Sequence, residues 1–171
     1  MKKTLPNVYV LTLICLVTAL LLAVVNSFTL PVIKAAEERA VQAALREVHA
    51  NGGNFTKLDL SKIDLSGTTT EISEVYEASE GGYVIKVVSA GYSTGLQIIV
   101  GIDKDGKVAG AKCLASGETL GYEKTYGDSL LGTDKDTISG IATVSGATKT
   151  TTGYKKAVQD ALSVAAALSG N

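Results

Sequence analysis

The chain begins with a long uncharged segment. Residues 5–33 contain no charged side chain, and residues 8–25 are almost wholly apolar. A helix needs roughly 20 apolar residues to cross a bilayer. The pattern therefore predicts one membrane-spanning helix in this part of the chain.

A cleaved signal peptide is the competing interpretation of this segment. The apolar core of a signal peptide is roughly 7–15 residues long and ends in a small-x-small cleavage site. The run here is longer, and residues 26–31 contain no Ala-x-Ala sequence. We therefore expect an uncleaved anchor. Lys2 and Lys3 precede it and favour a cytoplasmic N-terminus, although Lys34 and Arg39 behind it weaken that bias.

Behind the anchor, the period of the apolar residues stays helical over residues 34–48. The sequence Asn51-Gly52-Gly53 then predicts a helix end and a turn. Residues 54–67 are polar and predict irregular structure. The apolar residues of the predicted helix are Ala36, Ala40, Ala43, Ala44 and Val48.

Four apolar runs with turns between them predict an antiparallel meander. They cover residues 72–76, 83–88, 96–102 and 108–114. The turns contain Gly81-Gly82 and Asp105-Gly106, which are typical of hairpins.

The last third of the chain contains a polar stretch followed by a segment with a helical pattern of apolar residues. Residues 117–140 are rich in Gly, Asp and Thr and predict a surface loop region. From Tyr154 the helical period returns and predicts a helix almost to the end. Its expected buried stripe consists of Tyr154, Ala157, Val158, Ala161, Leu162, Ala165 and Leu168.

Together these elements predict an α+β protein in which a transmembrane helix precedes an antiparallel β-sheet domain with flanking helices. We expect residues 1–33 to form the cytoplasmic N-terminus and anchor, and residues 34–67 a juxtamembrane helix and linker. Residues 68–171 then form the extracytoplasmic domain.

The composition limits the kinds of binding site that the chain can be expected to contain. The 16 basic and 17 acidic residues nearly balance, so nothing indicates nucleic-acid binding. His49 is the one histidine and is expected at the end of the second helical segment. Cys15 and Cys113 are the two cysteines, and Cys15 lies in the anchor, so neither a disulfide framework nor a metal cluster is indicated. Residues 103–106 resemble the start of a calcium loop but lack its later ligands and predict a plain hairpin turn.

The most informative string is Ser-Gly-Ala-Thr-Lys-Thr at residues 145–150. Small side chains before a helix let a phosphate approach the backbone, and the first N–H groups of the helix favour the anion. Lys149 can hold a phosphate as a point charge. The alternative is that Thr150, Thr151 and Thr152 are ordinary helix N-caps.

A second candidate segment lies just beyond the last predicted strand, at residues 118–122. It is either an exposed loop or a surface in which a glycine and a hydroxyl beside an aromatic ring face a planar cofactor.

In these two segments, residues 145–150 and 118–122, the chain resembles the FMN-binding domain family. It is most similar there to the G subunit of the Rnf membrane electron-transport complex, a sibling of the C subunit of the sodium-translocating NADH:quinone reductase. In that family a flavin transferase joins FMN, through its phosphate, to the Thr after Gly-Ala. The resemblance implies that Thr148 is the acceptor. The rest of the motif is Ser145, Gly146, Ala147, Lys149 and Thr150.

The resemblance extends along the chain, through Gly91-Tyr92 before a strand and Asp105-Gly106-Lys107 in a hairpin. The family's flavin-facing Glu-Thr-Pro-Gly-Leu-Gly segment corresponds to residues 118–123. This implies that Glu118, Thr119 and Gly121 line the flavin ring. Three positions of this segment differ from the family pattern, and the stretch 121–145 is short. The three differences are Leu120, Tyr122 and Glu123.

The resemblance implies a membrane-anchored flavoprotein with covalent FMN that relays electrons within an ion-translocating complex. It would be an electron-carrying subunit rather than a complete enzyme, with one pass through the cell membrane and the domain outside. Its partners would be the other subunits, a flavin transferase and membrane lipid, with no nucleic acid. One alternative is a free-standing extracytoplasmic flavin carrier for a reductase or for extracellular electron transfer. Another is an anchored interaction or sensor module without flavin.

Overall fold

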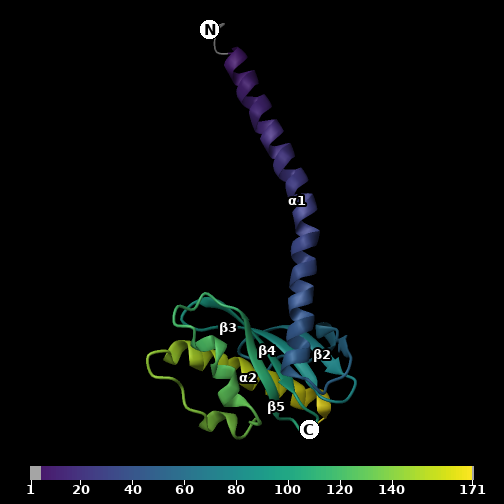
Figure 1. The fold of residues 1–171 in the computed structure, drawn as a ribbon, viewed down its shortest axis with the longest axis vertical. Coiled ribbons are helices and arrows are strands. Elements are labelled where there is room, and N and C mark those ends of the chain that lie inside the picture. Colours follow the sequence, from purple (N-terminus) through teal and green to yellow (C-terminus); the bar gives the residue numbers. More distant parts are fainter. Residues whose placement is uncertain (1–4, 171) are drawn as a thin grey trace. The chain divides into compact units, whose positions relative to one another are not determined.

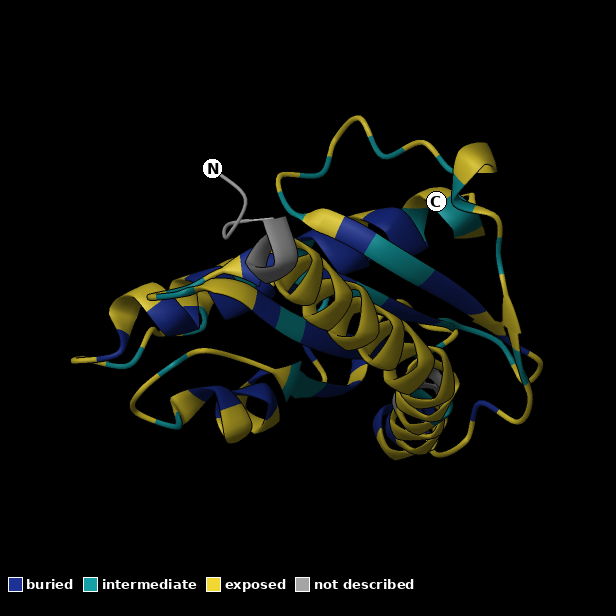
Figure 2. Ribbon diagram, turned by 90° about the horizontal axis from the view of Figure 1, so that it is seen from above, coloured by how far each residue is buried: buried dark blue, intermediate teal, exposed yellow. Residues whose placement is uncertain are grey.

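The computed structural model describes residues 5–170, and the chain forms two compact units, Met1–Ala40 and Val41–Asn171. Helix α1 (Leu5–Val48) contributes to both. Its segment Tyr9–Ile33 is long and apolar enough to cross a membrane, and none of it is buried within the protein. Figure 2 shows this part of α1 in the colour of exposed residues. The predicted apolar helix is confirmed, whereas Lys2 and Lys3 lie outside the described residues.

The second unit is built on a five-stranded sheet in which every strand pairs antiparallel with its neighbour in sequence (Figure 1). The predicted meander is therefore confirmed. The strands are β1 (Phe55–Lys57), β2 (Glu71–Ala78), β3 (Tyr83–Ala90), β4 (Thr94–Ile102) and β5 (Val108–Ala115).

Strand β1 falls in residues 54–67, where irregular structure was expected, and that prediction was wrong. Phe55 is the one apolar residue of β1, so no alternation marks it. Its pairing with β2, for example Phe55 opposite Ala78, is a tertiary interaction that a local pattern does not contain. A short 3-10 helix, η1 (Leu60–Lys62), follows it.

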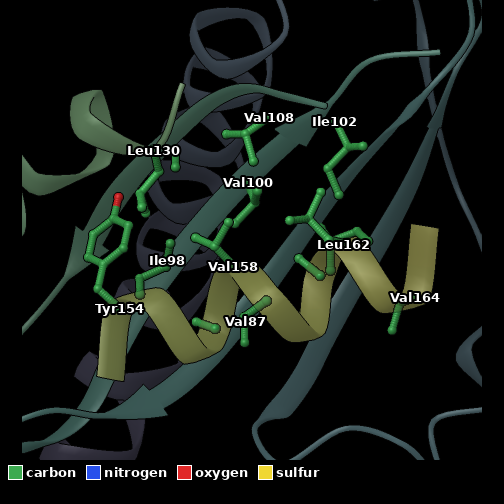
Figure 3. Packing of buried hydrophobic residues seen from close by; sticks show 14 of the residues in the cluster. Val87, Ile98, Val100, Ile102, Val108, Leu130, Tyr154, Val158, Leu162 and Val164 are labelled. Carbon is green, nitrogen blue, oxygen red and sulfur yellow. The ribbon is translucent and has the colours of Figure 1, made fainter. Parts of the chain in front are cut away.

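Alternation along the strands gives the sheet two apolar faces. One face packs against helix α2 (Thr148–Ser169), which contacts β3 and β4. Figure 3 shows Val158 and Leu162 of α2 beside Val100 of β4 in this main core. The other face packs against the end of α1. That smaller core consists of Ala44, Leu45, Val48, Tyr76, Val84 and Ile99.

Two glycines let α1 rest directly on the sheet. Gly101 and Gly110 are opposite each other on β4 and β5. A Cβ atom on Gly101 would lie 2.2 Å from the Val48 carbonyl oxygen, and one on Gly110 would lie 2.6 Å from it. The buried side chains of Leu45 and Val48 pack where this close approach is possible.

Residues 117–140 are more than a surface loop, so that prediction was incomplete. They contain η2 (Tyr122–Lys124), η3 (Tyr126–Leu130) and η4 (Ile138–Gly140). Tyr126, Leu130 and Ile138 are buried in the main core, and η3 packs on β5. The three buried residues stand among many polar ones, so the sequence did not reveal this packing.

Helix α2 begins at Thr148, six residues before the predicted start at Tyr154. Thr151 explains the difference, because its buried hydroxyl donates to the Ala147 carbonyl at 3.0 Å and accepts from the Val144 N–H at 3.2 Å. The N-cap is Ala147, so the interpretation of Thr150, Thr151 and Thr152 as N-caps is wrong. The predicted apolar stripe of α2 is confirmed, with Leu168 half-buried at its end.

Candidate functional site

Three segments of the second unit meet around one hollow of about 410 Å³. They are the turn between β3 and β4, the loop after β5 and the first turn of α2. The lining residues are Tyr92, Thr119, Leu120, Gly146, Ala147, Thr148, Lys149 and Thr150.

Glu118 holds the three segments together. Its carboxylate accepts hydrogen bonds from the backbone N–H groups of Tyr92 at 3.2 Å and Ser93 at 3.0 Å. It also accepts one from the hydroxyl of Thr150 in α2. A side chain at position 91 would require Glu118 to shift, since a Cβ on Gly91 would lie 2.5 Å from a Glu118 carboxylate oxygen. A glycine before Tyr92 therefore leaves Glu118 in the position where it accepts these bonds.

These bonds also set the charge of Glu118. Partial burial alone would raise its pKa, but the hydrogen bonds from Thr150, Ser93 and Tyr92 outweigh burial and hold the pKa below its ordinary value. Glu118 is therefore ionised at neutral pH, and its negatively charged carboxylate is hydrogen-bonded to these three donors.

The first turn of α2 presents the groups that bind anions. No side chain caps this helix end, and its first backbone hydrogen bond runs from the Thr151 N–H to the Ala147 carbonyl at 2.9 Å. The N–H groups of residues 148–150 precede that bond and have no acceptor within the helix. An anion placed there also meets the positive end of the helix dipole.

Gly146 and Thr148 leave this helix end open. Gly146 has a φ of +86°, a conformation that favours glycine, and no atom lies within 4 Å of the place where its Cβ would be. Thr148 is the exposed first residue of α2, and its hydroxyl makes a long 3.5 Å hydrogen bond to the Val144 carbonyl. The hydroxyl can therefore be reached from solvent.

Lys149 and Tyr92 face each other at the hollow. The Lys149 ammonium lies 5.8 Å from the centroid of the Tyr92 ring, within the range of a cation–π contact. Tyr92 is 69% exposed and Leu120 is 63% exposed, so the hollow has two large apolar side chains at its surface.

Most of the residues expected at the site lie together. Thr148, Lys149 and Thr150 border the hollow, and so do Gly146, Ala147 and Thr119. Glu118 braces its walls through the bonds described above. Neither Ser145 nor Gly121 is among its lining residues.

The lining also contains Tyr92 and Leu120, which were not expected as site residues. Tyr92 had a signal in the sequence, the Gly91-Tyr92 pair, but its place in the site depends on the contact between Glu118 and the turn. Tyr122, the aromatic residue of the loop expected to face a cofactor, does not border the hollow.

Glu123 closes the base of the loop that carries Glu118. It is buried, at 4% exposure, and its Oε1 accepts a hydrogen bond from the Ser116 hydroxyl at 3.1 Å. This difference from the family pattern therefore lies inside the domain, below the loop.

The donors and the shape of the hollow fit a molecule such as FMN. Helix N–H groups and Lys149 suit a phosphate, while Tyr92 and Leu120 offer apolar surface to a planar ring. The volume lies within the range of roughly 300–1,000 Å³ typical of small-molecule sites.

Comparisons with known proteins agree with this geometry. Residues 91–163 match the FMN-binding domain, and this range contains every residue that lines the hollow. Residues 1–48 match the RnfG N-terminal region. The G subunit of the ion-translocating oxidoreductase complex of Shewanella piezotolerans (strain WP3 / JCM 13877) is 30% identical over 129 residues. These residues cover 70% of this chain and 61% of the relative, so the chain spans less than two thirds of that relative's length. The resemblance expected from the motifs is confirmed, because the chain is similar to the FMN-binding domain and to the RnfG N-terminal region over these residues.

Proposed function

Because the chain joins an RnfG N-terminal region to an FMN-binding domain, we propose that it is a membrane-anchored flavoprotein with covalently attached FMN. In this proposal it relays electrons within an ion-translocating oxidoreductase complex, the kind of assembly named for its relative. The observation that carries the proposal is the exposed Thr148 hydroxyl at the uncapped start of α2, inside the hollow.

The covalent step is the formation of a phosphate ester at Thr148. The hydroxyl loses its proton and its oxygen bonds to the phosphorus of FMN, while another substituent of that phosphorus leaves with its bonding electrons. The donor must therefore be an FMN that already carries a leaving group on its phosphate, delivered by a flavin transferase. Thr148 is exposed, which gives such an enzyme access.

The chain's own residues then position the cofactor. The N–H groups of residues 148–150 and the Lys149 ammonium bind the phosphate, and Glu118 fixes the walls of the hollow. Thr119 and Gly121 belong to the loop that Glu118 and Glu123 hold in place. Bound FMN supplies the one- and two-electron chemistry that amino-acid side chains lack.

The anchor sets where this takes place. Segment Tyr9–Ile33 crosses the membrane in contact with lipid, the N-terminus is cytoplasmic and the FMN-binding domain is outside. The other subunits of the complex would supply and accept the electrons. A covalent bond suits this location, because a weakly held cofactor would be lost outside the cytoplasm.

Flavin labelling of the full chain tests the proposal. Produced together with a flavin transferase, the wild type should show in-gel flavin fluorescence and the added mass of FMN, and Thr148→Ala should show neither. Thr150→Ala and Thr143→Ala are the controls and should retain some label. Thr143 is the closer match, because Ile141-Ala142-Thr143 imitates the acceptor string with Ile in place of Gly. An unlabelled wild type would contradict the proposal and favour an interaction module.

A further inference from the structure

Tyr92 is the aromatic side chain among the residues that border the hollow, and the acceptor motif gives it no role. It comes from the turn between β3 and β4, far in the sequence from residues 145–150. With 69% of its surface exposed, it offers a large apolar face at the site. We infer that Tyr92 is the surface on which the isoalloxazine ring of FMN stacks, an inference that rests on the proposed function.

The backbone of Tyr92 is held in place although its side chain is exposed. The N–H groups of Tyr92 and Ser93 both donate to Glu118, whose carboxylate also accepts from Thr150. One side chain thus ties the turn to α2, two residues beyond Thr148. A flavin ring attached through Thr148 therefore meets a turn whose backbone is already fixed. Less conformational entropy is lost when the ring binds, because this backbone does not have to be ordered.

Lys149 shows the direction in which the Tyr92 ring faces. Its ammonium lies 5.8 Å from the ring centroid, and both side chains border the hollow. A phosphate on Thr148 attracts the same ammonium more strongly than a ring does, because it carries full charge. Lys149 would then pair with the phosphate, which would leave the face of Tyr92 available to the flavin.

Tyr122 is the natural alternative, because it follows the loop that resembles the family's flavin-facing segment. It is 40% exposed but does not border the hollow. Tyr122→Ala therefore removes a similar ring from a neighbouring position and serves as the matched control for Tyr92→Ala.

Flavin fluorescence distinguishes the two tyrosines, because a tyrosine stacked on a flavin quenches its emission by donating an electron to the excited ring. The experiment uses the full-length chain produced with a flavin transferase, as wild type, Tyr92→Ala, Tyr92→Phe and Tyr122→Ala. Intact mass measures the FMN attached to each, and emission is expressed per attached FMN. All four should carry FMN, since Tyr92 and Tyr122 lie outside the acceptor motif and are exposed.

We expect Tyr92→Ala to emit several-fold more per FMN than wild type, and Tyr122→Ala to match wild type. Tyr92→Phe should also be brighter, because Phe stacks but is a poor electron donor. Its visible circular dichroism should stay close to that of wild type, whereas that of Tyr92→Ala should change. Equal emission from wild type and Tyr92→Ala, or an increase confined to Tyr122→Ala, would overturn the inference and leave the proposed function intact. Absence of FMN mass from the wild type would overturn both.

Discussion

Glu118 is the residue on which the geometry of the hollow depends most directly. Its carboxylate accepts hydrogen bonds from Tyr92, Ser93 and Thr150, on two other segments of the chain. The family resemblance implied that it lines the flavin ring. Its contacts point to a role in holding Tyr92 and α2 in position, while Thr119 and Leu120 of the same loop border the hollow.

This role predicts a pH dependence at the site. The pKa of Glu118 is lower in the folded chain, so its stabilising bonds are complete above the unfolded-state pKa of about 4.3. They are lost as the pH falls through the lower, folded pKa. In amide NMR spectra, the N–H signals of Tyr92 and Ser93 should therefore titrate below about pH 4.3.

Glu118→Gln is the control for this titration, since it has no carboxylate and its amide group cannot accept all three bonds. Its Tyr92 and Ser93 amides should exchange faster with solvent at neutral pH and should show no titration. Glu80→Gln, in an exposed turn, should behave as wild type. A midpoint at or above the ordinary glutamate value would show that Glu118 is not held as described.

At the scale of elements, one buried carboxylate ties α2 to the sheet. Asp160 is 7% exposed, and its Oδ2 accepts four hydrogen bonds. The donors are the backbone N–H and hydroxyl groups of Thr69 and Thr70, at 2.7 to 3.1 Å. Thr69 and Thr70 directly precede β2, so this contact fixes the middle of α2 over the start of a strand.

Asp160→Ala should therefore destabilise the domain. Removing the carboxylate leaves part-buried donors without an acceptor, which costs about 2–3 kcal/mol for bonds to a charged group. Chemical denaturation of the wild type and the variant measures the difference. Asp105→Ala, in the exposed 103–106 turn, should stay within about 0.5 kcal/mol of wild type. Equal effects of the two substitutions would contradict this account of Asp160.

The elements differ in how far the sequence predicts them. Strands β2–β5 were predictable because their apolar residues alternate or run continuously between clear turn sequences. Strand β1 and the segment with η2 to η4 were not, because pairing with β2 and packing on β5 decide their structure. The start of α2 was missed because a run of threonines is a poor helix former, and the buried Thr151 hydroxyl compensates.

The residues of the site also differ in how far the sequence predicts them. The acceptor string at residues 145–150 is local, so its place at a helix start could be anticipated. The contribution of Tyr92 could not, because it depends on Glu118 bringing together segments that are 26 residues apart in the sequence.

At the scale of the whole molecule, the chain combines a compact unit that has a buried core with a helix whose described apolar segment is exposed. Segment Tyr9–Ile33 is 0% buried, and its exposed apolar side chains need another apolar environment. A bilayer supplies it over a length of roughly 20 residues. The hollow described above lies wholly in the second unit, so under the proposed function the apolar helix would set the location of the flavin and the second unit its chemistry.

The proposed topology makes a direct prediction. In intact cells, a protease added outside should digest the FMN-binding domain, and mass spectrometry of the mature N-terminus should find residues 5–33 still present. A cytoplasmic protein in the same cells should resist digestion until detergent is added. Cleavage of the mature chain between residues 26 and 36 would refute the anchor, and a protected domain would refute the orientation.

Attachment of FMN at Thr148 is tested most directly by peptide mapping. Trypsin cuts after lysine, so residues 136–149 and 150–155 separate into two peptides. After labelling with a flavin transferase, the FMN mass should appear on peptide 136–149, and fragmentation should place it on Thr148 rather than Thr143. An FMN mass on peptide 150–155 or on Thr143 would contradict the acceptor, and its absence from every peptide would contradict the flavoprotein itself.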